Sequence, residues 1–414
     1  MFARIQILNR DTVFVLLILL VTCALLLMPN LYNSPYAREE ERCAGQVLAV
    51  DDSLVKQFGI VKAGSQKLQV RLLDGPYAGR EVVASNVLIG KMESDKMFRS
   101  GDKVFLVLTT LGNNITAATA YDHYRLKIEA LLIALFAAVL IGFTGWSGAK
   151  ALLAFLFTVV TVWKVLLPGV LMGYDPIWTA LLAVIVIAGV TLFSIAGVGR
   201  TALVAWLGAL LGVFLTAALA SFLFPPFRLH GAILAYSETL LYSGFENLNL
   251  ERLFIAAVFL GASGAVIDLS IDVSAAMNEV SRKRPDLSIK ELMKSGLYVG
   301  RPMATTMVTT LFMAYMSEYM ALLMVLLSKG IPPLQVANLN FISAEVLKTV
   351  VGSFGLITVA PFTALVGGYL YGKRRSGHEE SLERTAKFPD GHTIQRSKSL
   401  LEAPPSSRES SHQP

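Results

Sequence analysis

Long apolar runs separated by short polar connections make up most of the chain. A helix needs about twenty apolar residues to cross the hydrocarbon core of a bilayer, and most runs approach that length. The first run, residues 12–28, predicts a retained N-terminal transmembrane anchor within residues 1–30. Seven further runs within 128–372 predict transmembrane helices at 128–146, 151–167, 177–196, 202–224, 253–273, 303–327 and 345–371. The pattern therefore predicts a polytopic α-helical membrane protein with about eight transmembrane helices.

Between the first and second runs, residues 31–127 follow a different pattern. Polar and apolar positions alternate with a period of two in 46–50, 67–73 and 104–108, as in half-buried β-strands. Turn-forming residues, among them Asp74 and Gly75, separate these stretches. We therefore predict a small β-rich domain, either a barrel or a sandwich, inserted after the anchor.

Composition and charge support membrane insertion and suggest an orientation. Of the 414 residues, 54% are hydrophobic and 16% are charged, whereas soluble domains carry about 25% charged residues. The net charge of +6 does not indicate nucleic-acid binding, because the basic residues cluster beside the apolar runs. With a cytoplasmic N-terminus, most basic connections lie on the cytoplasmic side, as the positive-inside rule requires. These connections contain Lys150, Arg200, the group from Arg282 to Arg301, and Lys373 to Arg375.

This orientation places both termini in the cytoplasm and makes the β-rich domain extracytoplasmic. Residues 373–414 are polar and rich in Ser, Arg and Glu, so we predict a disordered cytoplasmic tail. Cys23 lies in the anchor and Cys43 beyond it, so no disulfide is expected between them. The five histidines are scattered and no P-loop motif occurs. We therefore expect no cofactor and no enzymatic activity, and the sequence assigns no metal.

Two acids lie inside the apolar run placed at 253–273. A carboxylate in hydrocarbon costs roughly 2.5–3.5 kcal/mol on insertion scales, so such a residue is a functional candidate by default. Asp268 and Asp272 lie one helical turn apart on one face, to which Glu279 returns about three turns after Asp268. Carboxylate and amide oxygens suit protons and hard cations. The predicted ion- or substrate-binding residues are Asp268, Asp272, Ser274, Asn278 and Glu279.

The helical face that carries Asp268, Asp272 and Glu279, called the acidic stripe below, also has a structural interpretation. Gly261 and Gly264 continue it, and small residues there favour close packing of another helix. The acids would then be polar contacts that hold helices together, near one end of the span. The sequence leaves this alternative open.

A second, outer polar group is predicted toward the opposite membrane surface. Glu318 lies about two-thirds of the way through its apolar run, whereas Glu345 and Lys348 open the last run. The i,i+3 spacing of Glu345 and Lys348 predicts, by itself, a salt bridge at a helix start.

A glycine-containing segment precedes the sixth run of the helical domain. Gly296, Gly300 and Arg301 lie just before Pro302. They predict a cytoplasmic hinge or, alternatively, the start of a helix with proline inside it.

Three stretches carry a resemblance to a known family. They are 261–279 (GASGAVIDLSIDVSAAMNE), 295–301 (SGLYVGR), and 345–355 (EVLKTVVGSFG) with 361–363 (PFT). The chain resembles the YibE/F-like bacterial membrane proteins over the apolar part from about residue 128 to 372. It departs from the family pattern near Thr309 and Glu318, where the family tends to have Asn and Gly. The resemblance implies an integral, multi-pass protein of the bacterial cytoplasmic membrane and names no activity.

Two functions follow as expectations. The first is a secondary transporter or permease-like protein coupled to a proton or cation, in which Asp268 and Asp272 bind the coupling ion. The alternative is a non-transport envelope or assembly protein whose β domain binds an external partner. The lipid bilayer is the partner common to both, and the sequence specifies neither the substrate nor the oligomeric state.

Overall fold

The structure is a computed structural model that describes residues 10–32, 40–112 and 114–386, with backbone alone from residue 373 onwards. Seven of the described helices are long and apolar enough to cross a membrane, and the bent pair α9–α10 would add an eighth. The predicted number of about eight long apolar helices is thereby confirmed. The longer elements are α1 (Arg10–Leu27), α2 (Leu126–Thr144), α3 (Trp146–Thr161), α5 (Pro176–Ala196), α6 (Arg200–Leu223), α8 (Leu250–Lys283), α9 (Ile289–Glu318), α10 (Met320–Ser328) and α12 (Asn340–Ala386). The shorter ones are the π-helix η1 (Val162–Leu166), α4 (Leu167–Leu171), η2 (Pro225–Phe227), η3 (Gly231–Ile233), α7 (Ser237–Tyr242) and α11 (Pro333–Ala337).

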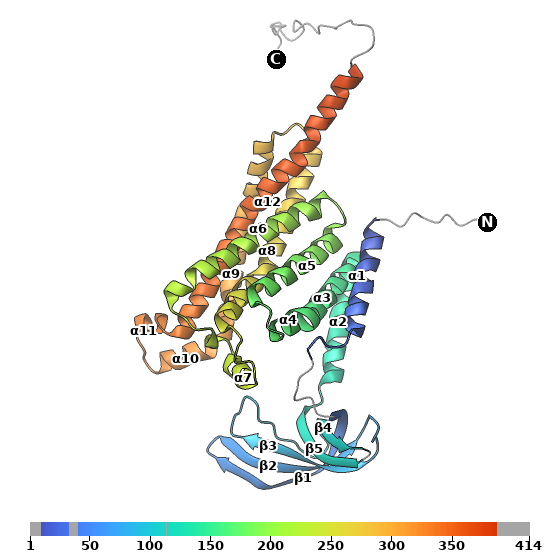
Figure 1. Ribbon diagram of the computed structural model, residues 1–414, viewed down its shortest axis with the longest axis vertical. Helices are drawn as coiled ribbons and strands as arrows, with labels where there is room; N and C mark the ends of the chain where they lie inside the picture. Colours follow the sequence, from blue (N-terminus) through green and yellow to red (C-terminus); the bar gives the residue numbers. More distant parts are fainter. Residues whose placement is uncertain (1–9, 33–39, 113, 387–414) are drawn as a thin grey trace, which may run out of the picture.

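Four long helices form the centre of the helical domain (Figure 1). α12 packs against α6, α8 and α9, and α8 also packs against α6 and α9. α5 joins this bundle to α3, which in turn contacts α1 and α2 at the periphery. α8 is therefore surrounded on most of its sides, and its residues face several different helices.

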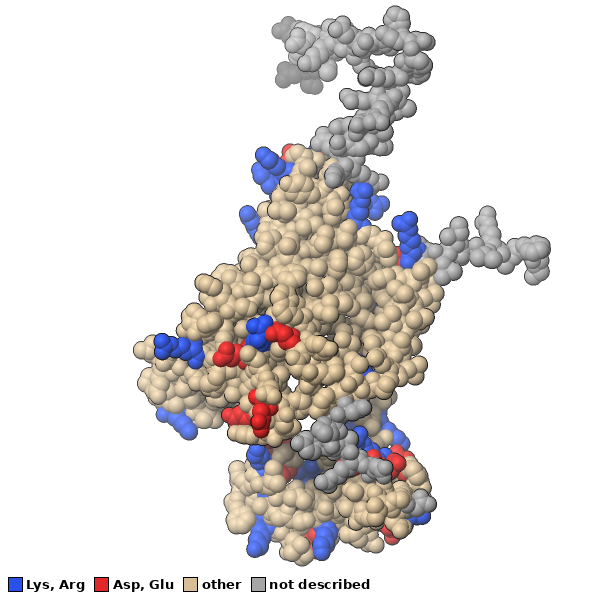
Figure 2. Space-filling view, in the orientation of Figure 1, with Lys and Arg blue, Asp and Glu red and all other residues tan. Residues whose placement is uncertain are grey.

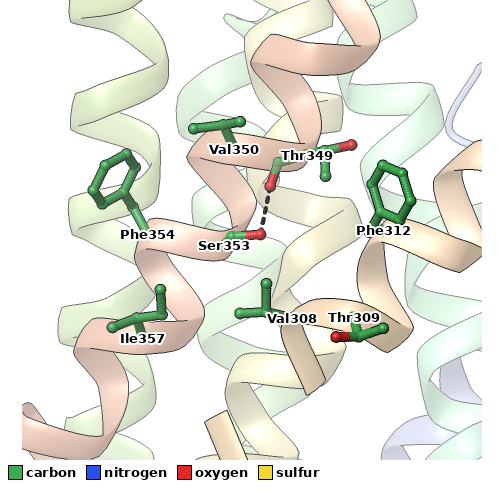
Figure 3. A pocket seen from close by; sticks show the side chains of 8 residues that line it. All are labelled: Val308, Thr309, Phe312, Thr349, Val350, Ser353, Phe354 and Ile357. Atoms are coloured by element: carbon green, nitrogen blue, oxygen red, sulfur yellow. Dashed lines mark hydrogen bonds between the residues drawn. The ribbon is translucent and has the colours of Figure 1, made fainter. Parts of the chain in front are cut away.

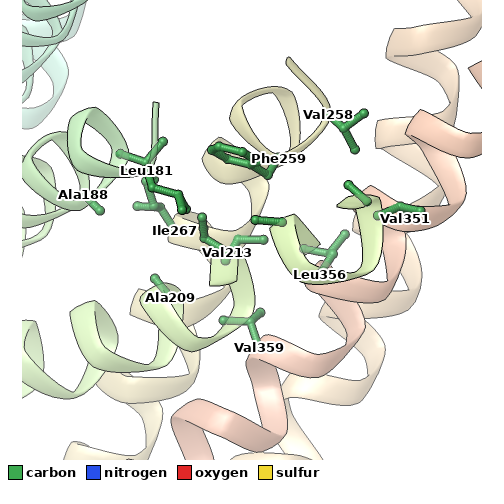
Figure 4. Close-up of a cluster of buried hydrophobic side chains, with 14 of the residues drawn as sticks. Leu181, Ala188, Ala209, Val213, Val258, Phe259, Ile267, Val351, Leu356 and Val359 are labelled. Atoms are coloured by element: carbon green, nitrogen blue, oxygen red, sulfur yellow. The ribbon is translucent and has the colours of Figure 1, made fainter. Parts of the chain in front are cut away.

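The core of the bundle is apolar and closely packed. Figure 4 shows Leu181 of α5, Val213 of α6, Phe259 of α8 and Leu356 of α12 within one cluster. Glycine allows the closest approach, because a Cβ atom on Gly208 would lie only 2.9 Å from the Cα atom of Thr363. α6 and α12 thus pack backbone to backbone, as small residues permit in membrane helices.

Local sequence signals fix the ends of several helices. Asp175 caps α5 by accepting hydrogen bonds from the backbone N–H groups of Ile177 (3.0 Å) and Trp178 (3.2 Å). Ser288 and Glu291 form a capping box at the start of α9. These caps satisfy backbone donors that the first turn of a helix leaves free.

Residues 40–123 form a closed five-stranded barrel. The strands are β1 (Glu40–Phe58), β2 (Val61–Leu72), β3 (Glu81–Ile89), β4 (Lys103–Leu111) and β5 (Asn114–His123). Their order around the barrel is β1-β2-β3-β5-β4, and a parallel β3–β5 pairing at Ser85 and Thr119 closes it. This order is the topology of the OB-fold. The barrel alternative of the sequence prediction is therefore confirmed, and the three expected strand segments lie in β1, β2 and β4.

The barrel interior contains one polar pair among apolar side chains. Gln66 and Asn86 are buried, and the Asn86 side-chain amide donates to Gln66 Oε1 at 3.1 Å. Gln66 Oε1 also accepts from the backbone N–H of Phe98 at 3.0 Å. These bonds hold the β3–β4 connection against the barrel, because Phe98 belongs to that connection.

The structure corrects three predicted boundaries. The helix predicted at 303–327 is not one straight span: α9 begins at Ile289 and ends at Glu318, and α10 turns away by 65°. α8 runs from Leu250 to Lys283 and so extends beyond both ends of the span predicted at 253–273. α12 continues to Ala386, beyond the expected end of the last span, and residues 387–414 of the predicted tail lie outside the described residues.

The ends of the molecule differ in charge. The barrel lies at one end and the far end of α12 at the other, and the start of α1 is the end of that helix that points away from the barrel (Figure 1). Figure 2 shows basic side chains at the end opposite the barrel and charged side chains on the barrel itself. A broad band with few charges separates them, interrupted on this face by a small group of acidic and basic side chains.

Candidate functional site

The outer polar group assembles where α9 ends and α12 begins. Lys348 Nζ lies 3.4 Å from Glu318 Oε2 and 3.6 Å from Glu345 Oε2. The same ammonium group lies 4.0 Å from the ring centroid of Tyr315, in a cation–π arrangement. The predicted Glu345–Lys348 pair is thus present, and it belongs to a larger group that also contains Glu318 and Tyr315.

Several polar atoms of this group lack a partner. Glu345 is 2% exposed, and its Oε1 atom makes no hydrogen bond within the described part of the chain. The same is true of the buried Tyr315 hydroxyl. Thr349 Oγ1 also makes no well-formed hydrogen bond, although it is close enough to the Glu345 carboxylate to interact with it. An unsatisfied buried polar group costs about 1–3 kcal/mol, and more when it is charged. Each such group therefore needs an explanation, and a ligand is one.

A cavity of about 790 Å³ adjoins this group. Glu318, Tyr319, Glu345 and Lys348 form one polar side of it, and apolar side chains form most of the remainder. Cavities of 300–1,000 Å³ with apolar walls and a few placed polar groups are typical of small-molecule sites. The apolar wall includes Leu166, Leu167, Val170, Ile233, Leu253, Phe254 and Leu260, from α4, η3, α8 and their neighbours.

The backbone is irregular at three places on the cavity wall. Leu166 ends the π-helix η1, and such turns are frequent at functional sites. Tyr319 lies at the break between α9 and α10. Tyr236 has a φ of 62°, which costs a bulky L-residue free energy. Broken helices that line a cavity are a recurring feature of transporter binding sites.

The inner acids lie deeper on a helix that also lines this cavity. Ala257 lines the cavity, and Asp268 lies about 20° from it around α8 and about 16 Å further along the helix axis. Asp268 and Asp272 are both exposed in the isolated chain. A Cβ atom on Gly264 would meet nothing within 4 Å. The close packing expected at Gly264 is therefore wrong, and this face of α8 is open.

Tyr315 spans the distance between the outer group and the acid-bearing face. Its ring lies under Lys348, and a Cβ atom on Gly261 would lie 2.7 Å from its hydroxyl oxygen. Gly261 thus leaves space for a polar atom at the upper end of the stripe that contains Asp268. The sequence analysis missed Tyr315, although it stands three residues before Glu318 and therefore on the same side of α9.

The remaining residues of the predicted inner site are dispersed. Ser274 is buried on another side of α8, where it contacts the hydroxyl of Tyr371 (2.8 Å) and donates to the carbonyl of Thr201 (2.8 Å). Glu279 pairs with Lys283 of the same helix at 3.0 Å. Asn278 lies about 80° around the helix from Asp268. Ser274 therefore does not share the helical face that carries Asp268 and Asp272.

The residues of the predicted hinge lie inside the unbroken part of α9. Gly296 and Gly300 are buried, and Cβ atoms there would lie 2.9 Å from Met277 Cγ and 2.7 Å from Ala360 Cβ. Arg301 follows on the exposed side. Close packing accounts for both glycines, and the break in this chain segment falls at Tyr319 instead.

A smaller groove of about 400 Å³ lies between α9 and α12, on another side of Thr349 (Figure 3). Its lining consists of Val308, Thr309, Phe312, Thr349, Val350, Ser353, Phe354 and Ile357. Ser353 donates to the backbone carbonyl of Thr349 at 2.7 Å. No ionisable side chain lines this groove, so the charge chemistry of the outer end belongs to the larger cavity.

Comparison with known proteins identifies the class and then the family. Within the described residues, the number of helices long and apolar enough to cross a membrane is typical of a helical membrane protein. A family model described as YibE/F-like protein matches residues 132–373, more than half of the chain, and the chain belongs to that family. No curated protein and no solved structure matches the chain.

Proposed function

We propose that this protein is a secondary transporter coupled to a proton or another cation, in the cytoplasmic membrane of a bacterium. The observation that carries the proposal is Glu345, a carboxylate that is 2% exposed and lines a cavity of about 790 Å³. Ionisable residues within a membrane domain are costly, and they mark ion and substrate pathways by default.

The charge of the outer group supports coupling to a cation. Glu318 and Glu345 carry two negative charges, and Lys348 supplies one positive charge to both. A proton or cation that reaches Glu345 would balance the group and release Lys348 from Glu345, while Lys348 stays beside Glu318. Binding would then change the contact between α9 and α12, the two helices that hold these residues.

The inner acids supply a second position for the ion. Asp268 and Asp272 lie further along α8, on the face that also lines the outer cavity. An open, acidic face is unfavourable against lipid chains. In the proposal this face borders a water-filled path, and Asp268 and Asp272 bind the coupling ion after it leaves the outer cavity. The barrel end of the molecule faces outward in this arrangement.

The test uses full-length protein in liposomes that contain a pH-sensitive dye. A panel of inorganic cations and small organic solutes is added outside. The dye records proton flux, and the uptake of each added cation is measured separately. We expect one or more solutes to drive flux, and Glu345→Gln and Asp268→Asn to abolish it. Thr309→Val, in the uncharged groove, is the control and should keep the parent rate. Equal flux in the parent and both acid variants would exclude the proposal.

A non-transport function is the alternative, and one observation favours it. Val83, Val87 and Ile89 on β3 of the barrel are 68%, 61% and 63% exposed. In the OB-fold topology the face formed by strands β2 and β3 is a common ligand surface. If an envelope partner binds there, Val87→Glu should abolish that binding and leave flux through the helical domain unchanged.

A further inference from the structure

We propose that the cavity beside Glu345 binds a monovalent organic cation with a large apolar body. This inference deepens the proposed function by naming the substrate class. It rests on that function only for the step of transport, because binding itself requires the cavity alone.

The size and lining of the cavity set the apolar body of the ligand. The cavity measures about 790 Å³, and its walls are mostly aliphatic and aromatic side chains of α4, η3 and α8. Burial of apolar surface in such a space stabilises a bound apolar group, in proportion to the area removed from water. An inorganic ion would leave most of this space unused. Moreover, no group of three or more His, Cys, Asp or Glu side chains that could bind a metal occurs within the described residues.

The charged side of the cavity sets the sign of the ligand. The ionisable acids and bases in its lining are Glu318, Glu345 and Lys348, which leave one negative charge in excess when both glutamates are ionised. Arg252, the next cation along α8, is already paired with Asp175. An anion would therefore add a second uncompensated charge. A monocation would balance the group.

The unpartnered atoms set the position of the cationic centre. Glu345 Oε1 and the Tyr315 hydroxyl are both buried, and neither has a hydrogen-bond partner among the described residues. The Tyr315 ring already accepts a cation, since Lys348 Nζ lies over it at 4.0 Å. Tyr315 itself lies outside the cavity lining, so a ligand cation in the cavity would compete with Lys348 for the Glu345 carboxylate. Lys348 would be left with Glu318, which lies 3.4 Å from it.

A pair of probes with equal shape and opposite charge tests the inference. Tetraphenylphosphonium is a monocation with an apolar body, and tetraphenylborate is the matching anion. Binding to the purified full-length protein in detergent is measured by equilibrium dialysis, with protein-free micelles as the blank. We expect saturable binding of the phosphonium, at one site per chain, and no saturable binding of the borate.

Variants locate the site and separate charge from folding. Glu345→Gln should weaken phosphonium binding about tenfold or more, which is the effect of losing one ionic contact. Glu318→Gln, at a 62% exposed side chain, should weaken it less. Thr309→Val, outside the cavity, should bind as the parent does. Thermal unfolding of each variant shows that it is folded. If Glu345→Gln does not fold, bulk introduced by Ala257→Leu on the cavity wall replaces it, with the same expected loss.

The outcomes divide clearly. Equal binding of both probes, or phosphonium binding that Glu345→Gln and Ala257→Leu leave unchanged, would overturn the inference. Specific phosphonium binding without flux of any solute would support the inference and contradict transport. Solute flux that phosphonium does not inhibit would support transport and overturn the inference.

Discussion

The hydroxyl of Tyr236 donates a hydrogen bond to Glu93 Oε1 at 3.1 Å, and thereby joins the rim of the outer cavity to the barrel. The two residues belong to different domains. Tyr236 lines the cavity with a φ of 62°, and Glu93 lies in the β3–β4 connection of the barrel. The barrel therefore contacts the cavity at a residue whose backbone is held in an unfavourable conformation.

This contact should restrain the rim segment. Tyr236→Phe removes the hydrogen bond and keeps the ring, so amide hydrogen exchange in residues 234–243 should become faster. The hydrogen bond to Glu93 raises the pKa of Tyr236, so wild-type protein should lose the same protection only as the pH rises through that raised pKa. Tyr242→Phe is the control, because that side chain is 87% exposed. Unchanged exchange in Tyr236→Phe would mean that the barrel does not restrain the rim.

The orientation of the chain can be tested by cysteine labelling in intact cells. We expect a cysteine at Ser94, exposed on the barrel, to react with a membrane-impermeant maleimide, and one at Lys290, at the start of α9, to react only after lysis. The native Cys43 should not be labelled by the maleimide. Burial, helped by the nearby Asp74 and Glu41 carboxylates, raises its pKa to about 11, so about one thiol in a thousand is ionised at pH 8. Labelling in the opposite order would reverse the proposed topology.

The inner acids should matter for function more than for folding. Asp268→Asn and Asp272→Asn keep the side-chain volume and remove the charge, so folded protein should accumulate at a near-normal level while flux is lost. Gly208→Leu is the control for misfolding, because its side chain would collide with Thr363, and overpacking of this kind costs about 1–3 kcal/mol or more. Gly264→Leu should be tolerated, since that position faces open space. Acid variants that instead lose stability and keep full flux would favour a structural role.

The ion pair between Asp175 and Arg252 should fasten the outer ends of α5 and α8. Desolvation raises the pKa of Asp175, but hydrogen bonds from Arg252, Trp178 and Ile177 outweigh it, so the net pKa is lowered from 3.8. Its contribution to stability is therefore present at neutral pH and is lost as the pH falls below 3.8. Asp175→Ala should cost about 1 kcal/mol through the lost cap alone, with a further loss from the pair. A double-mutant cycle with Arg252→Ala, read by thermal unfolding, separates these two effects; full additivity would show that the pair contributes nothing.

Hydrophobic periodicity predicted most of the fold, and it failed where helices deviate from regularity. The run at 303–327 looks continuous, because a break at Tyr319 does not change its hydropathy. The π-turn at 162–166 is equally invisible in the pattern. The sequence analysis missed strand β3, because its outward-facing residues Val83 and Val87 are apolar. The alternation of polar and apolar positions that marks a half-buried strand is therefore absent there.

The candidate site was predicted in part for a related reason. Helical periodicity alone predicted that Asp268 and Asp272 lie side by side, because both residues belong to the same helix. Ser274 was included with these acids because it is close to them in the sequence. In the structure its hydroxyl instead contacts that of Tyr371 on another helix. The meeting of Glu318 with Lys348 depends on how α9 packs against α12, and a single sequence carries no direct signal for that contact. Tyr315 was missed because an aromatic residue in an apolar run is most simply read as core.

The outer group offers a final prediction that requires no known substrate. Lys348→Met would leave Glu345 as a buried charge beside Glu318, and breaking such a pair costs about 3–5 kcal/mol. Glu345→Gln should destabilise the protein much less than Lys348→Met does, since it removes a carboxylate whose Oε1 atom already lacks a hydrogen-bond partner. Replacing both residues with apolar ones, as in Glu345→Leu with Lys348→Met, should recover most of the stability lost in Lys348→Met, because buried ion pairs are often no more stable than well-packed apolar side chains. Thermal unfolding of the three variants measures this order. If the double variant were instead the least stable, the pair would be a structural bond that holds α9 to α12. If it is as stable as the parent, the fold does not need the charges, and their presence at a buried position favours a role in function.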